Sequence, residues 1–279
     1  MDKAIGIFDS GVGGLSVMRE IRNILPAVKL IYFADQENVP YGSRPVEEIR
    51  GFSTGITSFL VGQGSGIVVV ACNTASAAAL FPLRSTFPET PFVGMEPAVK
   101  PAAETTHSNV VGVLATPATF QGKLFESVVE RFASNVKICR STCPGLVQQI
   151  EAGQLDSPET RHILELALLP MLDAGADAIV LGCTHYPFVI PAIEKIVGQR
   201  ARVIDPSPAV ARQAARIYNA SGWDITRTEA DLPVVRGETV LYTSGDPGIM
   251  EKTIIKLMGE KLPVRKAVWR SGAIVVSKS

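Results

Sequence analysis

Two cysteines, Cys72 and Cys183, occupy matching places in the sequence, and their thiols could transfer protons. Each ends an apolar run and is followed at once by polar residues, in the segments VVVACNTASA (68–77) and AIVLGCTHYP (178–187). At a helix N-terminus the macrodipole favours a thiolate, so we expect the pKa of such a thiol to fall from about 8.5 toward neutrality. The polar residues that follow offer capping oxygens and donors to an anionic ligand that bears a carboxylate.

A cysteine at the end of an apolar strand is often only a small hydrophobic residue. Two such cysteines at equivalent positions favour a functional interpretation instead. Cys139 and Cys143 differ, because their C-x-x-x-C spacing has no matching His or second Cys pair. We therefore interpret Cys139 and Cys143 as structural or incidental, and we expect no metal site.

A third candidate site is the segment IFDSGVGG (7–14), which presents Asp9 and Ser10 beside glycines that let a backbone pass close to a ligand. It lacks the G-K-[ST] of a phosphate loop, and Ser16 stands where G-x-G-x-x-G requires a third glycine. A nucleotide site is therefore not expected. Asp9 could equally cap a helix.

The chain between these motifs alternates between short apolar runs and longer segments with helical spacing. Strands are predicted at 4–8, 30–34, 66–71, 91–94, 110–115, 136–139, 178–182, 201–204 and 239–243. Helices are predicted at 14–25, 45–62, 74–86, 97–106, 117–132, 144–152, 158–174, 188–197, 208–221 and 247–258. The strands lack polar alternation, which is typical of a parallel α/β sheet covered on both faces. In such a sheet the ligand crevice lies beyond the carboxyl ends of the strands, where both cysteines fall.

The length of the chain predicts two domains, because 279 residues are many for a single hydrophobic core. Proline-punctuated turns at 94–97 and 205–208 mark candidate boundaries. We expect an N-terminal α/β domain of residues 1–95 plus 208–279, in which the C-terminal segment completes the sheet. The second α/β domain is expected to comprise residues 96–207, and the repeated strand-cysteine pattern suggests that the two domains are pseudo-duplicated.

Composition and charge argue against several functional classes. Lys and Arg total 27, as do Asp and Glu, so the formal charge is zero and a nucleic-acid partner is not expected. The chain shows no signal peptide and no apolar run near the eighteen or so residues of a membrane span, so we expect a soluble, unexported protein. Four cysteines are too few for a disulfide framework in a chain of this length, and we expect free thiols.

The motifs taken together resemble those of the glutamate racemases in the aspartate/glutamate racemase superfamily. They are IGIFDSGVGGLSV, YFADQENVPYGSRP, VVACNTASA, MEPAVKPA, VGVLATPATF, CPGLVQQIEAG, GADAIVLGCTHYPFV, VIDPSPAVARQ and, near the C-terminus, TSGDP. The resemblance implies an α/β fold of two pseudo-symmetric domains, each a mainly parallel sheet flanked by helices, with the active site in the cleft between them. It also implies interconversion of L- and D-glutamate without cofactor or metal. A cytoplasmic homodimer that supplies D-glutamate for peptidoglycan would follow from the same resemblance.

The resemblance assigns roles that suit racemisation, which needs a base on one face of the α-carbon and an acid on the other. Cys72 would act on D-glutamate and Cys183 on L-glutamate, each returning a proton in the reverse direction. Asp9 would assist Cys72, while His185, oriented by Glu151, would assist Cys183. The implied substrate contacts are Asp9, Ser10, Tyr41, Gly42, Asn73, Thr74, Thr116, Thr119, Thr184 and His185.

The residues alone leave other interpretations open. His185 could be a packed core histidine, Glu151 a solvated carboxylate, and Thr116 and Thr119 a helix cap and its first turn. An aspartate racemase is the nearest alternative enzyme. A dithiol redox protein is disfavoured by the lack of C-x-x-C, and a two-lobed amino-acid-binding protein by the paired thiols and the missing signal peptide.

Overall fold

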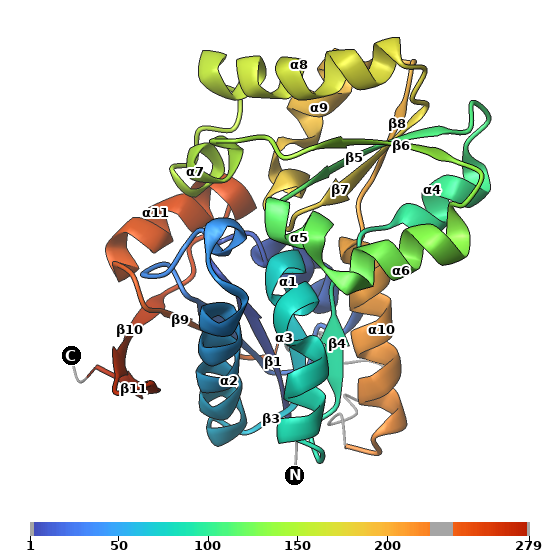
Figure 1. Ribbon diagram of the computed structural model, residues 1–279. Helices are drawn as coiled ribbons and strands as arrows, with labels where there is room; N and C mark the ends of the chain where they lie inside the picture. The colour runs from blue at the N-terminus through green and yellow to red at the C-terminus, as the bar shows by residue number, and fades with distance from the viewer. Residues whose placement is uncertain (1–2, 224–236, 278–279) are drawn as a thin grey trace, which may run out of the picture.

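Two β-sheets organise the chain, one above the other in the view of Figure 1. The computed structural model describes residues 3–223 and 237–277. The lower sheet has the order β11 (Ala273–Val276), β10 (Val264–Arg270), β9 (Thr239–Thr243), β2 (Leu30–Ala34), β1 (Ala4–Asp9), β3 (Ser65–Val70) and β4 (Phe92–Gly94). The upper sheet has the order β6 (Lys137–Ser141), β5 (Val110–Ala115), β7 (Ala178–Gly182) and β8 (Arg202–Ile204). Neighbouring strands run parallel, except that β10 and β11 are antiparallel.

Helices flank both sheets (Figure 1). Those that accompany the lower sheet are α1 (Leu15–Ile24), α2 (Val46–Gly62), α3 (Asn73–Thr86), α10 (Ser207–Ala220) and α11 (Pro247–Met258). Those that accompany the upper sheet are α4 (Val99–Thr105), α5 (Pro117–Gln121), α6 (Lys123–Phe132), α7 (Leu146–Glu151), α8 (Pro158–Asp173) and α9 (Ile190–Val197). There are two 3-10 turns among the described residues, η1 (Tyr41–Ser43) between β2 and α2 and η2 (Tyr186–Val189) between β7 and α9. No helix in the described ranges has both the length and the apolar character needed to cross a bilayer.

Alternate residues of a central strand enter different apolar cores, which explains the absence of polar alternation. Ile5 and Ile7 of β1 pack in one core with residues of α1 and α10. Ala4 and Phe8 point to the opposite face, where α2 and α3 cover the sheet. Every residue of this strand is buried. The predicted parallel sheet covered on both faces is therefore confirmed.

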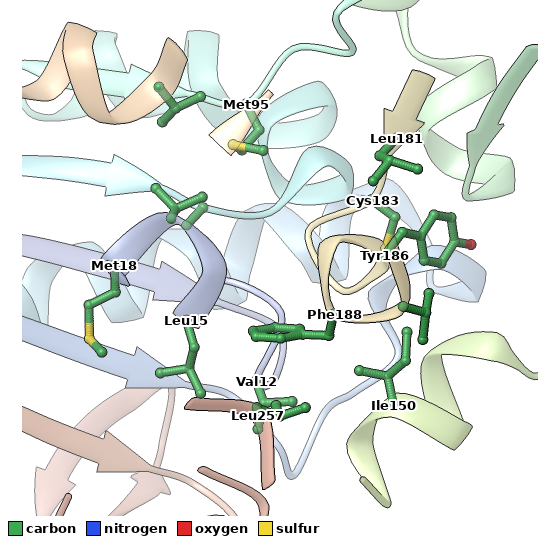
Figure 2. Close-up of a cluster of buried hydrophobic side chains, with 14 of the residues drawn as sticks. Val12, Leu15, Met18, Met95, Ile150, Leu181, Cys183, Tyr186, Phe188 and Leu257 are labelled. Carbon is green, nitrogen blue, oxygen red and sulfur yellow. The ribbon is translucent and has the colours of Figure 1, made fainter. Parts of the chain in front are cut away.

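One apolar core continues from the lower sheet into the upper one (Figure 2). Phe188 extends from η2 toward Val12, in the loop before α1, and Leu15, the first residue of α1, and Leu181 and Cys183 belong to the same cluster. This shared core holds the facing edges of the two sheets together. Because β1–β4 and β9–β11 form one sheet and β5–β8 the other, we propose the domains 1–95 plus 208–279 and 96–207.

The structure corrects some predicted elements. The helix predicted at 117–132 is two helices, because Gly122 between them is extended, with φ −74° and ψ 134°. The helix predicted at 188–197 starts as η2 and becomes α-helical only at Ile190, because Pro191 has no N–H and fits only the first turn of a helix. Cys183 therefore precedes a 3-10 turn rather than an α-helix. Strands β10 and β11 were not predicted. β10 carries charged residues between its apolar ones, and β11 is an apolar run of only four residues that is mostly exposed.

Candidate active site

Both cysteines lie where an open parallel sheet binds ligands. In the lower sheet β2 and β3 lie on opposite sides of β1, and in the upper sheet β6 and β7 lie on opposite sides of β5. Ligands bind beyond the carboxyl ends of strands at such reversals of strand order. Cys72 follows β3 and Cys183 follows β7. The two sheets face each other at these ends, and both thiols line one cavity between them.

The cavity that holds the thiols is small, with a volume of about 20 Å³. Its lining consists of Ser10, Pro40, Tyr41, Gly42, Cys72, Asn73, Thr74, Thr116, Val147, Cys183, Thr184 and His185. We call the lower sheet with its helices the lower lobe and the upper sheet with its helices the upper lobe. The cavity accommodates about one water molecule, so the two lobes must separate to admit an amino acid. Among the residues predicted from sequence, Asp9, Thr119 and Glu151 do not line the cavity but lie behind residues that do.

Cys72 is the N-cap of α3, and its Sγ accepts a hydrogen bond from the N–H of Ala75 at 3.4 Å. Its Sγ lies 3.9 Å from the Oγ of Ser10. Burial raises the pKa of Cys72 well above its usual value, and the nearby Asp9 carboxylate raises it further. The predicted lowering of this pKa is therefore wrong, because desolvation outweighs the helix N-terminus. The resting thiol is protonated and needs a base.

Asp9 is a fully buried carboxyl beside Cys72. It accepts hydrogen bonds from the N–H of Gly14 at 3.0 Å and of Gly11 at 3.3 Å, and from the hydroxyl of Thr184 at 3.4 Å. Burial raises the pKa of Asp9 above its usual value, although the positive charge of His185 opposes the shift. A carboxylate of raised pKa is a stronger base, so Asp9 is suited to take up the proton of Cys72. Asp9 thus orders the loop before α1 and also belongs to the site.

Behind Cys183 lies a buried pair of His185 and Glu151. The Nδ1 of His185 is 3.8 Å from the Sγ of Cys183, and its Nε2 is 2.6 Å from the Oε1 of Glu151. Burial alone would lower the pKa of His185, but the hydrogen bonds to Cys183 and Glu151 and the charge of Asp9 raise it well above its usual value. Burial alone would raise the pKa of Glu151, but the hydrogen bond and charge of His185 lower it. The pair is therefore an imidazolium and a carboxylate, and Glu151 is not a solvated side chain.

Glycines in the loop between β1 and α1, here called the first loop, make room for His185 and Glu151. A Cβ on Gly11 would overlap the carboxylate of Glu151, and a Cβ on Gly13 would overlap the ring of His185. Between them, the N–H of Val12 donates to the Oε1 of Glu151 at 2.7 Å. The glycine-rich segment is therefore the place where the lower lobe passes closely over residues of the upper lobe.

Among the described residues, the cavity contains one polar side chain without a partner, which could bind a ligand, and two hydroxyls that link the lobes. The amide of Asn73 is buried, and neither its nitrogen nor its oxygen has a hydrogen-bond partner in the described structure. The hydroxyls of Thr74 and Thr116 lie 2.8 Å apart and join the two lobes. Thr116 also caps α5, accepting from the N–H of Thr119 at 3.2 Å. Thr116 is thus both a helix cap and a cavity residue, whereas Thr119 supports it from behind.

A second, larger cavity of about 860 Å³ adjoins the first and shares Gly42 and Thr74 with it. Its lining includes the cations Arg44, Arg50, Arg84 and Lys123 and the carboxylate Glu96. The chemistry belongs to the small cavity, which holds both thiols. Thr74, which lines both cavities, contacts Thr116 in the lining of the small one.

Several residues around the site were not predicted from sequence. Asp35 follows β2 and is buried, accepting a hydrogen bond of 2.6 Å from the hydroxyl of Tyr41. Its position after β2 matches that of Asp9 at the end of β1, and this parallel could have identified it. Val147, in the segment CPGLVQQIEAG, and Pro40 line the cavity without a chemical signal of their own.

The other thiols lie outside this cavity. Burial raises the pKa of Cys143 to about 12, which leaves it an unreactive thiol at neutral pH. Within residues 3–223 and 237–277, no group of three or more His, Cys, Asp or Glu side chains is arranged to hold a metal ion.

Known proteins of one family share both the sequence and the fold of this chain. Residues 5–214 match the family described as Asp/Glu/Hydantoin racemase. The chain is 50% identical over 245 residues to a glutamate racemase of Roseiflexus sp. (strain RS-1), covering 88% of each protein. A crystal structure of a Bacillus anthracis glutamate racemase isoform matches with a TM-score of 0.82 at 29% identity, covering 97% of this chain and 98% of that one. Escherichia coli glutamate racemase, crystallised with L-glutamate and an activator, matches with a TM-score of 0.81 at 28% identity, covering 99% of this chain and 100% of that one. The chain therefore belongs to the Asp/Glu/Hydantoin racemase family.

Proposed function

We propose that the protein interconverts L- and D-glutamate, with Cys72 and Cys183 as the two groups that exchange protons with the α-carbon. The observation that carries this proposal is the presence of both thiols in the lining of one small cavity, each backed by ionisable groups. Racemisation needs two acid–base groups on opposite faces of one carbon, and a pair of thiols from facing lobes suits that need. The relatives named above are glutamate racemases, and this supports glutamate as the substrate.

The proposed reaction is a pair of proton transfers. With L-glutamate, His185 holds the proton released by Cys183, whose sulfur removes the α-proton, so the C–H bond breaks and an S–H bond forms. The electron pair left on the α-carbon then takes the proton of the Cys72 thiol from the other face, and D-glutamate results. The raised pKa of Cys72 keeps this proton in place before the reaction. In the reverse direction Asp9 accepts the proton of Cys72 and so creates the thiolate.

The carbanion must be stabilised as it forms, because an α-proton is held far more tightly than that of a thiol. The unpartnered amide of Asn73 and the hydroxyls of Thr74 and Thr184 are donors in the cavity that suit the substrate carboxylates. A cavity with room for about one water molecule keeps bulk solvent from these donors, which strengthens their interactions with the substrate. Ser10, Tyr41, Gly42, Thr116 and His185 complete the proposed substrate contacts, with Asp9 and Thr119 acting from behind the cavity wall.

The test is racemisation of L-glutamate followed by circular dichroism. Cys72→Ala and Cys183→Ala are each expected to abolish activity, while Cys139→Ala, which changes a half-buried thiol outside the cavity, retains it. Wild-type activity in either of the first two variants would overturn the two-thiol mechanism. Racemisation of aspartate in preference to glutamate would correct the substrate.

The resemblance to glutamate racemases extends the proposal beyond the site. We propose that the D-glutamate formed serves peptidoglycan biosynthesis, that the enzyme acts in the cytoplasm and that it is a homodimer. Light scattering in solution tests the last point, since a mass of one chain, 29.8 kDa, would contradict it.

A further inference from the structure

We propose that Gln36 is a positioning residue: it holds Glu151, and through it His185, in line with Cys183, and Thr243 fixes Gln36 in turn. The inference rests on the proposed function, because it assigns Gln36 to one of the two proton transfers. Gln36 directly follows Asp35 after β2, and Thr243 is the last residue of β9. Neither residue lines the catalytic cavity.

A continuous series of side-chain contacts leads from Thr243 to Cys183. The hydroxyl of Thr243 donates to the Oε1 of Gln36 at 2.9 Å. The Nε2 of Gln36 donates to the Oε2 of Glu151, also at 2.9 Å. The other oxygen of Glu151 contacts His185 at 2.6 Å, and His185 contacts Cys183 at 3.8 Å. Of these contacts, the one between Gln36 and Glu151 crosses from the lower lobe to the upper one, so this contact requires the lobes to be closed.

The orientation of the Gln36 amide follows from its partners. The carboxylate of Glu151 can only accept hydrogen bonds, because its pKa is lowered by His185, so the NH₂ of Gln36 must face it. The carbonyl oxygen of Gln36 then faces Thr243. The Thr243 hydroxyl accepts from the N–H of Gly245 at 3.0 Å, which leaves its own hydrogen free to donate to Gln36. Each hydrogen bond from Thr243 through Gln36 to Glu151 therefore pairs a donor with an acceptor.

The surrounding backbone is shaped to admit Gln36. A Cβ on Gly245 would lie 2.8 Å from the Cβ of Gln36 and 3.3 Å from its Oε1, both closer than ordinary contact. The segment TSGDP that contains Thr243 and Gly245 lies beyond residue 214, where the family match ends. The C-terminal part of the chain thus reaches the catalytic centre through Gln36.

The positioning matters because Glu151 crosses from one lobe to the other. Glu151 ends α7 beside the upper sheet, and both Gln36 and the N–H of Val12 reach it from the lower sheet. Val12 and His185 contact Oε1, while Gln36 contacts Oε2, so Gln36 fixes the rotation of the carboxylate. Loss of this contact disturbs the aim of His185 at Cys183, while the hydrogen bonds of Asp9 to Gly14 and of Cys72 to Ala75 do not involve Gln36.

The experiment compares Gln36→Met, Gln36→Glu, Thr243→Val and Thr243→Ser with the wild-type enzyme. Gln36→Met keeps the length of the side chain and removes its donor, and Gln36→Glu places a second carboxylate against Glu151. Thr243→Ser keeps the hydroxyl that Thr243→Val removes. Gln63→Met is the matched control, because Gln63 is an exposed residue after α2 whose side chain contacts the hydroxyl of Tyr242 and neither Glu151 nor Thr243. The readouts are kcat and KM for both enantiomers and the isotope effects with L- and D-[2-²H]glutamate.

Gln36→Met is expected to lower kcat about tenfold, the effect of one hydrogen bond to a charged group, with Gln36→Glu lower still. Thr243→Val is also expected to lower kcat, and Thr243→Ser to keep most of the wild-type kcat. Because only the Cys183 transfer slows, the isotope effect rises for deuterated L-glutamate and falls for deuterated D-glutamate. Wild-type kinetics in Gln36→Met, or a loss with both isotope effects unchanged, would overturn the proposal. Absence of glutamate racemisation in the wild-type enzyme would instead refute the proposed function, so the two failures are distinct.

Discussion

Replacing Glu151 by Gln removes the charge of the carboxylate while keeping its shape, and it should affect both stability and catalysis. The side chains of His185 and Glu151 are only 2% and 13% exposed, so solvent screens their interaction little. Removing one partner of a buried pair costs about 3 kcal/mol, because the other charge is left without compensation. For a chain of this size each kcal/mol lowers Tm by about 2–4 °C, so Tm should fall by about 6–12 °C.

The loss should depend on pH in a defined direction. The pKa of His185 is raised from its usual 6.5, so the pair contributes its full stability below that pH and loses it as pH rises through the folded value. The pKa of Glu151 is lowered from its usual 4.5, so its contribution is present above that pH and is lost as pH falls through the folded value. The difference between wild type and Glu151→Gln is therefore largest near pH 6 and shrinks in alkaline solution.

Urea denaturation at pH 6 and at pH 9 measures this difference directly, and NMR of the His185 ring follows its protonation. Glu89→Gln is the control, because Glu89 is an exposed carboxylate in the turn after α3. The reasoning is refuted if Glu151→Gln unfolds within about 0.5 kcal/mol of wild type at pH 6, as surface substitutions do. An unchanged titration of His185 in the variant would refute the assignment of its raised pKa to Glu151.

Further predictions concern the first loop and the contact between the lobes. Gly11→Ala should displace Glu151 and reduce kcat, whereas Gly51→Ala in α2, whose Cβ meets nothing within 4 Å, should raise the free energy of unfolding by about 1 kcal/mol without loss of activity. Full activity in Gly11→Ala would contradict the close passage seen here. Thr116→Val should raise KM for both enantiomers, because the hydroxyl that meets Thr74 across the cleft is lost, and should cost about 1 kcal/mol of stability as a helix cap. Thr116→Ser should restore both quantities, and a KM unchanged in Thr116→Val would argue against a closing role.

The sequence predicted those parts of the fold that depend on local pattern. Unbroken apolar runs such as 66–71 and 178–182 identified the central strands, because such strands are buried on both faces. The same criterion missed β10, whose outer position allows charged residues such as Arg265 between apolar ones, and β11, a mostly exposed apolar run of only four residues. The predicted helix boundary was wrong at Gly122, where the backbone is extended and a Cβ would lie 2.8 Å from that of Ala77 in α3.

The sequence predicted the site residues whose side-chain type indicates their chemistry. It did not predict properties that depend on burial or on distant partners. Cys72 and Cys183 were assigned to one site from their matching strand ends, and the structure places both in one cavity. The direction of the Cys72 pKa could not be predicted, because it depends on desolvation and on Asp9, which lies far away in sequence. Gln36 gave no signal, since its partner Glu151 is 115 residues away along the chain.

The most direct test of the central claim is racemisation of L-glutamate in ²H₂O, stopped after a small fraction of conversion, with both enantiomers separated and analysed by mass spectrometry. Two thiols on opposite faces of the α-carbon predict that the D-glutamate formed carries one solvent deuteron at that carbon, while the remaining L-glutamate is still protiated. D-glutamate that retains the original α-hydrogen, or equal labelling of both enantiomers from the start, would show that a single group moves the proton and would contradict the account.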